Sequence, residues 1–279
     1  MNKKNYQSDL SDEQWYLLEE IIPQKNKIGR PREYSIRSIL NAIFYITRTG
    51  CQWRYLPINY PPWNTVYYYF KKFKENGLIE RINLMLCKKL RQQENKNPEP
   101  SLIIIDSQSV KTIQKGEERG YDGNKKVKGR KRHILVDTLG LVWAVFVHSA
   151  ANQDRSIAVD FIDRISPFSS RLKTLLGDLG YVSNKLKEKV KEKLNANLEI
   201  KKHPWDGRQG GWYPVKSRPK RILKPNKFVV LPKRWIVERS FAWINNHRRN
   251  SKDYEHDPKS SETFIFLSMI SNTMKRIFK

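Results

Sequence analysis

Apolar residues in the first 91 positions recur every three or four residues, the spacing of helices with one buried face. Polar capping residues and helix-ending Pro and Gly residues divide this pattern into four short helices. The expected N-caps are Ser11, Ser35 and either Asn64 or Thr65, and the expected breaks are Pro23, Gly50 and Gly77. Short helices with tight turns and basic flanks are typical of helix-turn-helix DNA-binding domains. An ordinary helical bundle with a solvated basic face is the alternative.

The pattern changes after residues 92–100, a polar stretch with two prolines that we interpret as a linker. Two hairpin-linked strands and then alternating strands and helices predict a mixed α/β sheet over residues 101–279. Residues 203–231 show little periodicity and are interpreted as a loop or small insertion. Strands are expected at 103–106, 132–137, 141–148, 172–177 and 198–201, and helices at 155–165, 183–194, 233–249 and 261–278.

The chain is strongly basic, with 54 Lys and Arg against 28 Asp and Glu and a formal net charge of +26 over 279 residues. Such a charge attracts polyanions, and nucleic acid is the expected partner. An anionic membrane is the competing partner, but no apolar run approaches the roughly 20 residues of a spanning helix. The N-terminus lacks the apolar core of a signal peptide. Cys51 and Cys87 are too few for a disulfide framework or cysteine-rich zinc site, which favours a cytoplasmic protein.

Three acidic residues stand where a catalytic metal site would need them. Asp106 ends the strongest apolar run, 102–106, and Asp178 ends a second one, 172–178. A carboxylate at the exit of a buried strand projects into the crevice where α/β folds bind ligands. Glu238 lies in an aromatic, arginine-rich segment that is expected to be helical. Two Mg²⁺ ions need several hard oxygen ligands, so these acids together predict metal-dependent chemistry on phosphates.

Each acid also has an ordinary interpretation. Asp106 and Asp178 can cap turns after their strands, and a helical Glu usually lies on a solvated face. Other acids compete for the role. Asp137 is expected to face a hairpin turn, away from the crevice. Asp154, Asp160 and Asp163 are interpreted as helix caps or surface charge.

At these positions the chain resembles the bacterial insertion-sequence DDE transposases of the IS5 group, in the broader IS4/IS5 set. The resemblance rests on Asp106–Thr112, Gly177–Tyr181 and Arg234–Trp243 in the C-terminal part. In the N-terminal part it rests on Leu10–Trp15, Gly29–Pro31 and Gly50–Pro57. It therefore covers nearly the whole chain in order.

The resemblance implies an α/β RNase H-like catalytic domain over 101–279, preceded by an all-α helix-turn-helix-like domain over 1–91. It implies cleavage and transfer of the element's DNA ends, with Asp106, Asp178 and Glu238 as catalytic residues and metal ligands. The expected metal is Mg²⁺, with Mn²⁺ as a substitute. The expected partners are the terminal inverted repeats, target DNA and further copies of the chain in a homodimer or higher oligomer.

The segment around Glu238 departs from the related IS4 pattern, Tyr-x2-Arg-x3-Glu-x6-Lys. Arg234 and Glu238 fit that frame, but Leu231 stands at the tyrosine position and Asn245 at the lysine position. The resemblance therefore assigns no role to Leu231 or Asn245. The three acids themselves are intact.

Basic segments are the candidates for DNA contact, because consecutive cations suit phosphates. The densest segment is 125–132, which is expected to lead into a strand and otherwise to be a solvated loop. A Gly-Arg-Pro-Arg turn could enter a minor groove. Trp205 and Trp212 could stack on an unpaired base, or simply pack the loop onto the domain. The candidate DNA-binding residues are Arg30, Arg32, Lys125, Lys126, Lys128, Arg130, Lys131, Arg132, Arg234, Arg248 and Arg249.

Three functions are compatible with these patterns. The first is a nucleoid-associated transposase. The second is a DNA-binding regulator that retains the fold without the chemistry, which the intact acids disfavour. The third is a host nuclease that cuts DNA without strand transfer. Inverted repeats flanking the coding region would separate the first from the third.

Overall fold

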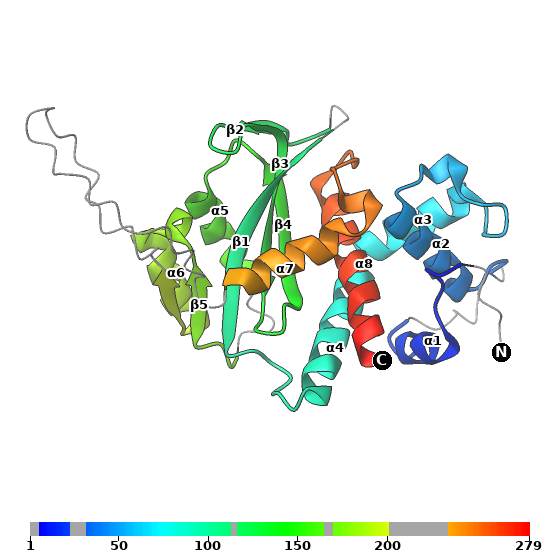
Figure 1. The fold of residues 1–279 in the computed structure, drawn as a ribbon, viewed down its shortest axis with the longest axis horizontal. Helices are drawn as coiled ribbons and strands as arrows, with labels where there is room; N and C mark the ends of the chain where they lie inside the picture. Colours follow the sequence, from blue (N-terminus) through cyan, green and yellow to red (C-terminus); the bar gives the residue numbers. More distant parts are fainter. Residues whose placement is uncertain (1–5, 23–31, 113–115, 165–169, 201–233) are drawn as a thin grey trace, which may run out of the picture.

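The computed structural model describes residues 6–22, 32–112, 116–164, 170–200 and 234–279 (Figure 1). A bundle of short helices at the N-terminus contacts a mixed sheet through its last helix. Among the described residues, no helix is both long and apolar enough to cross a membrane.

The N-terminal helices follow the predicted pattern closely. α1 (Asp12–Glu19) has the Ser11 capping box, and α2 (Ile36–Thr49) is capped by Ser35 and ends at Gly50, whose φ is 71°. The 3-10 helix η1 (Trp53–Tyr55) lies in the loop between α2 and α3. α3 (Trp63–Glu75) starts directly after Pro62, before both predicted caps, because proline already fixes a φ suited to a helix start. α4 (Leu78–Gln93) completes the bundle.

The sheet runs in the order β2-β3-β1-β5-β6, and β4 also pairs with β3. β1 is antiparallel to β3 and parallel to β5, and β5 is parallel to β6. The strands are β1 (Leu102–Lys111), β2 (Gly120–Asp122), β3 (Val127–Val136), β4 (Val142–Ser149), β5 (Thr174–Gly177) and β6 (Asn197–Ile200).

Two strands differ from the sequence expectation. β1 does not end at Asp106 but continues to Lys111, because β3 hydrogen-bonds to it along residues 104–111. β3 begins at Val127, so most of the basic segment 125–132 is itself strand. The short strand β2 was not predicted. Pairing between strands decides these boundaries, and the local pattern of apolar residues does not indicate which strands pair.

Helices cover both faces of the sheet. α5 (Asp154–Phe161), the 3-10 turn η2 (Ile162–Arg164) and α6 (Asn184–Leu194) lie on one face, beside the 3-10 turn η4 (Leu179–Tyr181). α7 (Arg234–Asn245) crosses β1 on the other face, and α8 (Pro258–Ile277) packs against β4 and α4 (Figure 1). The 3-10 turn η6 (Arg248–Asn250) joins α7 to the segment that precedes α8. This coverage on both sides explains why β3 is buried despite its charged residues.

A buried ion pair connects the helical bundle to the sheet. The Arg91 guanidinium on α4 lies 2.6 Å from the Asp137 carboxylate, which is fully buried. Asp137 also accepts hydrogen bonds from the backbone N–H groups of Leu139 and Leu141, so it belongs to the hairpin turn, as predicted. On the same helix, the Asn83 side chain donates to the carbonyl of Val142 at 2.7 Å.

Candidate active site

Asp106 and Asp178 lie side by side where the parallel pairing of β1 and β5 ends. The register pairs Ile104 with Leu176, and continuing it by two residues brings Asp106 level with Asp178. A close approach between Gly177 and Ile105 supports this continuation, because a Cβ built on Gly177 would lie 3.3 Å from Cγ2 of Ile105. Both carboxylates are only partly buried.

Each of these carboxylates is oriented by a backbone group. One oxygen of Asp106 accepts from the N–H of Ser107 at 2.8 Å. One oxygen of Asp178 accepts from the N–H of Gly180 at 2.9 Å, so Asp178 caps the 3-10 turn η4. These bonds hold each carboxylate close to its own strand end and restrict its rotamers.

Glu238 comes from α7, on the face of the sheet toward which Asp106 points. Asp106 pairs with Ile134 on β3, and side chains two residues apart on a strand share a face, so Arg132 points the same way. The Arg132 guanidinium contacts the carbonyls of Asn250 and Lys252, which follow α7 in the chain. α7 packs against β1, and its Glu238 side chain is exposed.

The pKa of the buried Tyr181 hydroxyl also shows which carboxylates lie near Asp106 and Asp178. Burial raises its pKa well above the ordinary value, and the negative charges of Asp106, Asp154 and Asp178 raise it further. These three carboxylates therefore lie near one phenol hydroxyl. The structure thus brings Asp106 and Asp178 together and adds Asp154, which sequence analysis had assigned to a cap or surface charge.

The donor set suits a hard cation. Asp106, Asp178 and Glu238 offer carboxylate oxygens, the ligands that Mg²⁺ and Mn²⁺ prefer. In the part of the chain that the structure describes, no three His, Cys, Asp or Glu side chains are close enough to hold a metal ion as they stand. The three acids would therefore have to come closer together before they could bind one metal centre.

The expected DNA contacts divide into exposed and buried residues. Lys125, Lys126 and Lys128 are exposed at the β2–β3 turn. Arg130, Lys131 and Arg132, in contrast, are 0%, 5% and 1% exposed. The expectation that these three contact DNA is therefore wrong for this structure. Their charges are used internally, because helices cover both faces of β3.

Arg130 shows the internal use most clearly. Its guanidinium pairs with Asp253 at 3.3 Å, with both side chains fully buried, and donates to the carbonyls of Glu117, Glu255 and His256. These contacts fix the segment before α8 to the sheet. A cation with this many acceptors has no surface left for a phosphate.

The remaining candidates also include both exposed and buried residues. Arg32 and Arg248 are exposed, whereas Arg249 is buried, pairs with Glu255 at 2.7 Å and donates to the carbonyl of Cys51. Arg249 therefore also serves an internal contact, and its expected role at DNA is wrong. Asn245 is exposed on α7. Arg30, the Arg234 side chain, Leu231, Trp205, Trp212 and the expected insertion at 203–231 lie outside the described residues.

Comparison with known families agrees with this arrangement. Residues 97–273, more than half of the chain, match the family described as "Transposase DDE domain". The chain belongs to the DDE transposases. Residues 10–83 match a second family, described as "Putative transposase of IS4/5 family", which places the chain in the IS4/IS5 set that its motifs resemble.

One curated relative supports the assignment to an insertion element. It is the "Insertion element IS402 uncharacterized 16.2 kDa protein" of Burkholderia cepacia, 27% identical over 119 residues, which cover 40% of this chain and 78% of the relative. The DDE transposase domain implies an RNase H-like fold, and the mixed sheet with helices on both faces agrees with it. The predicted α/β class with an N-terminal helical region is confirmed at that level.

Proposed function

We propose that this transposase binds the ends of its insertion sequence and catalyses Mg²⁺-dependent strand cleavage followed by strand transfer. The observation that carries the proposal is the level placement of Asp106 and Asp178 at the end of the β1–β5 pairing, on the face that α7 crosses with Glu238. Acids at adjacent strand ends can share one metal centre, and a third acid from a neighbouring helix can complete it.

In this mechanism the three acids hold the cation and the basic surface holds the DNA. A bound divalent metal would supply activation of the attacking oxygen and stabilisation of the leaving oxygen. Asp106 and Asp178 would orient that centre through their backbone hydrogen bonds, so that little reorganisation is needed during reaction. Because the acids repel a phosphate backbone, nearby cations are needed to bring a DNA strand to them.

The exposed lysines of the β2–β3 turn are the best candidates for those cations. Lys125, Lys126 and Lys128 lie at one end of the sheet, and the Lys125 ammonium lies 3.1 Å from the carbonyl of Ser107, the residue next to Asp106. This turn therefore lies beside the acids. Three closely spaced exposed cations would grip the DNA backbone without reading bases.

Replacing Lys125, Lys126 and Lys128 with Gln should weaken binding to element ends and to random duplex alike. Each phosphate contact that is lost should reduce the slope of log K against log salt concentration by about 0.9. Fluorescence anisotropy over a salt series measures both quantities. A triple variant of exposed α6 residues, Lys185, Lys187 and Lys193 to Gln, removes the same charge and serves as the control. An equal slope in the two triple variants would mean that Lys125, Lys126 and Lys128 remain in solvent and do not contact DNA phosphates.

The N-terminal helices are proposed to recognise the element ends. α3 presents Tyr68, Lys71 and Lys72 on its exposed side, a combination of hydrogen-bonding and cationic groups suited to a DNA groove. This arrangement supports the helix-turn-helix-like role for the bundle, with α3 as the reading helix.

Substituting Tyr68→Ala in the full chain should reduce the preference for element ends over random duplex by about 1–3 kcal/mol, the range for one specific base contact. Lys71→Gln with Lys72→Gln should weaken both kinds of binding. Competition binding with end and scrambled duplexes separates the two effects. Tyr55→Ala, which changes another exposed tyrosine outside α3, is the matched control. A specificity loss of equal size in that control would remove α3 from the reading role.

The direct test is incubation of the purified protein with labelled element-end DNA and Mg²⁺, with products resolved on a sequencing gel. Cleavage at the element boundary followed by joining to a second duplex supports a transposase. Cleavage without joining favours the nuclease alternative, and binding without cleavage favours the regulator.

A further inference from the structure

A chain of polar groups links strand β3 to the turn that carries Asp178. The Lys131 ammonium lies 2.9 Å from Oδ1 of Asp154, and Nε2 of His133 lies 3.3 Å from the same oxygen. The other ring nitrogen of His133, Nδ1, lies 3.2 Å from the hydroxyl of Tyr181. Tyr181 ends the 3-10 turn η4, three residues after Asp178. This series of polar contacts therefore runs from Asp154, the first residue of α5, to the turn that follows Asp178.

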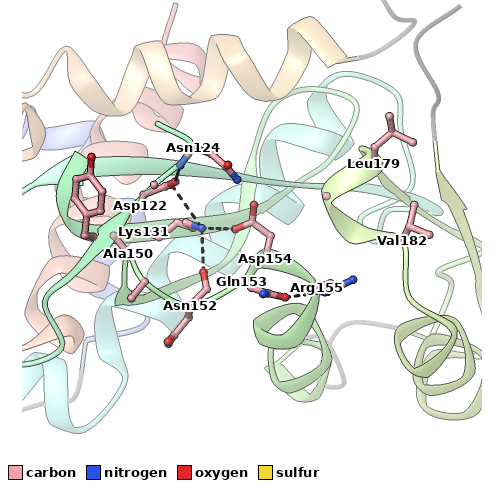
Figure 2. A pocket seen from close by; sticks show the side chains of 14 residues that line it. Asp122, Asn124, Lys131, Ala150, Asn152, Gln153, Asp154, Arg155, Leu179 and Val182 are labelled. Carbon is pink, nitrogen blue, oxygen red and sulfur yellow. Dashed lines mark hydrogen bonds and ion pairs between the residues drawn. The ribbon is translucent and has the colours of Figure 1, made fainter. Parts of the chain in front are cut away.

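The same turn also approaches Asp154 at Gly180. A Cβ built on Gly180 would lie 3.1 Å from Oδ1 of Asp178 and 3.6 Å from Oδ2 of Asp154. The two carboxylates thus lie next to one residue that has no side chain. Figure 2 shows Asp154 between Lys131 and the turn of Leu179 and Val182, in the wall of a cavity of about 440 Å³.

Pairing with Lys131 alone does not account for this arrangement. A buried ammonium needs acceptors, and Lys131 also has the carbonyl of Asn152 at 3.0 Å and the carboxylate of Asp122 at 3.7 Å. A counter-ion would require neither the approach of Asp154 to His133 nor its approach to Gly180. These two contacts both lead to the Asp178 turn.

The protonation of His133 decides which atoms donate and which accept between Asp154 and Tyr181. Burial lowers the pKa of His133, which favours the neutral ring, and a neutral imidazole has one donor and one acceptor nitrogen. The Asp154 carboxylate lies 3.3 Å from Nε2 without hydrogen-bond geometry, and its negative charge favours the form in which Nε2 carries the proton. Nδ1 then accepts from the Tyr181 hydroxyl, and that bond holds the end of the turn.

We propose that Asp154 is a positioning residue for Asp178, acting through His133 and Tyr181. The proposal rests on the proposed function, because it assumes that Asp178 is a catalytic acid. Asp154 selects the histidine tautomer, the tautomer accepts the tyrosine hydroxyl, and the tyrosine fixes the turn in which the Gly180 N–H orients the Asp178 carboxylate. The residue is not part of any motif that carried the family resemblance.

The test compares Asp154→Asn and Tyr181→Phe with the full wild-type chain. Asp163→Asn is the matched control, because Asp163 is a neighbouring exposed carboxylate whose pairing with Lys189, at 2.8 Å, leads away from the turn. Hydrogen–deuterium exchange reads the backbone amides of residues 179–182 without DNA. Cleavage of element-end DNA over a Mg²⁺ series, binding of that DNA and the Tm complete the measurements.

Both test variants should exchange the Gly180 amide about five- to tenfold faster than the control, the effect of losing about one net hydrogen bond. They should also need more Mg²⁺ for half-maximal cleavage and cleave more slowly at saturation, with DNA affinity unchanged. Asp154→Glu, which keeps the carboxylate, should recover part of the loss. If Asp154→Asn does not fold, Tyr181→Phe decides alone, because it removes only a hydroxyl.

Exchange equal to that of the control would overturn the proposal. Faster exchange with an unchanged Mg²⁺ requirement and rate would also overturn it, because Asp154 would then stabilise the turn without affecting catalysis. Failure of the wild-type chain to cleave is a different result. It would refute the proposed function and with it the catalytic part of this inference, while the exchange data would still report whether Asp154 holds the turn.

Discussion

Asp106→Ala, Asp178→Ala and Glu238→Gln should each abolish cleavage of element-end DNA and leave binding of that DNA largely intact. Metal ligands act on charge that develops in the transition state, whereas lysine and arginine contacts to phosphates carry the affinity. Loss of one ligand should cost several kcal/mol of transition-state stabilisation, a rate loss on the order of 10³-fold or more. Single-turnover cleavage and anisotropy on the same DNA measure the two effects.

Two controls sharpen this prediction. Asp160→Asn changes another α5 acid that no motif and no site contact involves, and its cleavage should equal wild type. Ca²⁺ should support binding with little cleavage, because its loose coordination positions the attacking oxygen poorly. Wild-type cleavage by any one of the three acid variants would remove that residue from the catalytic set.

Arg130→Ala should destabilise the fold by about 3–5 kcal/mol, although Arg130 belongs to the most basic segment of the chain. Its partner Asp253 is fully buried and would lose its paired cation, while it keeps the Ser261 hydroxyl and the backbone N–H of Glu255 as donors. Three backbone carbonyls would also each lose a donor. Urea unfolding followed by circular dichroism gives the change in the free energy of unfolding.

Lys128→Ala is the natural comparison, because it removes the same charge from the same strand at an exposed position. Its effect on unfolding should stay within about 0.5 kcal/mol, as for most surface substitutions. Lys128→Ala should weaken DNA binding more than Arg130→Ala does, when Arg130→Ala is measured at a temperature where it remains folded. A loss of less than about 1 kcal/mol in the free energy of unfolding of Arg130→Ala would mean that the buried Arg130–Asp253 pair contributes little to stability. That result would contradict the internal structural role of Arg130.

The local features of the fold could be predicted because their causes lie within a few residues. The Ser11 capping box, the Ser35 cap and the left-handed Gly50 all form from contacts inside one helix end. The hairpin turn at 138–140 also follows from local composition. Asp106 and Asp178 were found because both follow apolar runs, and the parallel register of β1 and β5 then brings them level.

The strand boundaries, and which of the basic side chains are buried, could not be predicted in the same way. β1 continues past Asp106 because β3 pairs with it, and β3 is located by hydrogen bonds to a distant segment. Four of the proposed DNA-binding cations are buried instead. Asp253, the partner of Arg130, is separated from it by 123 residues, so no local pattern distinguishes that buried arginine from a phosphate-binding one.

The sequence by itself determined the family and predicted the class of chemistry and three candidate acids, because motifs and apolar runs are local and keep their order along the chain. Only the tertiary structure decided which cations remain on the surface and that Asp154 joins the neighbourhood of Asp178. The physical reason is that burial and pairing depend on which segments pack together across the sheet. A carboxylate that opens a helix has the same local sequence whether it caps that helix in solvent or, as Asp154 does, contacts His133 and Lys131 from a covered face.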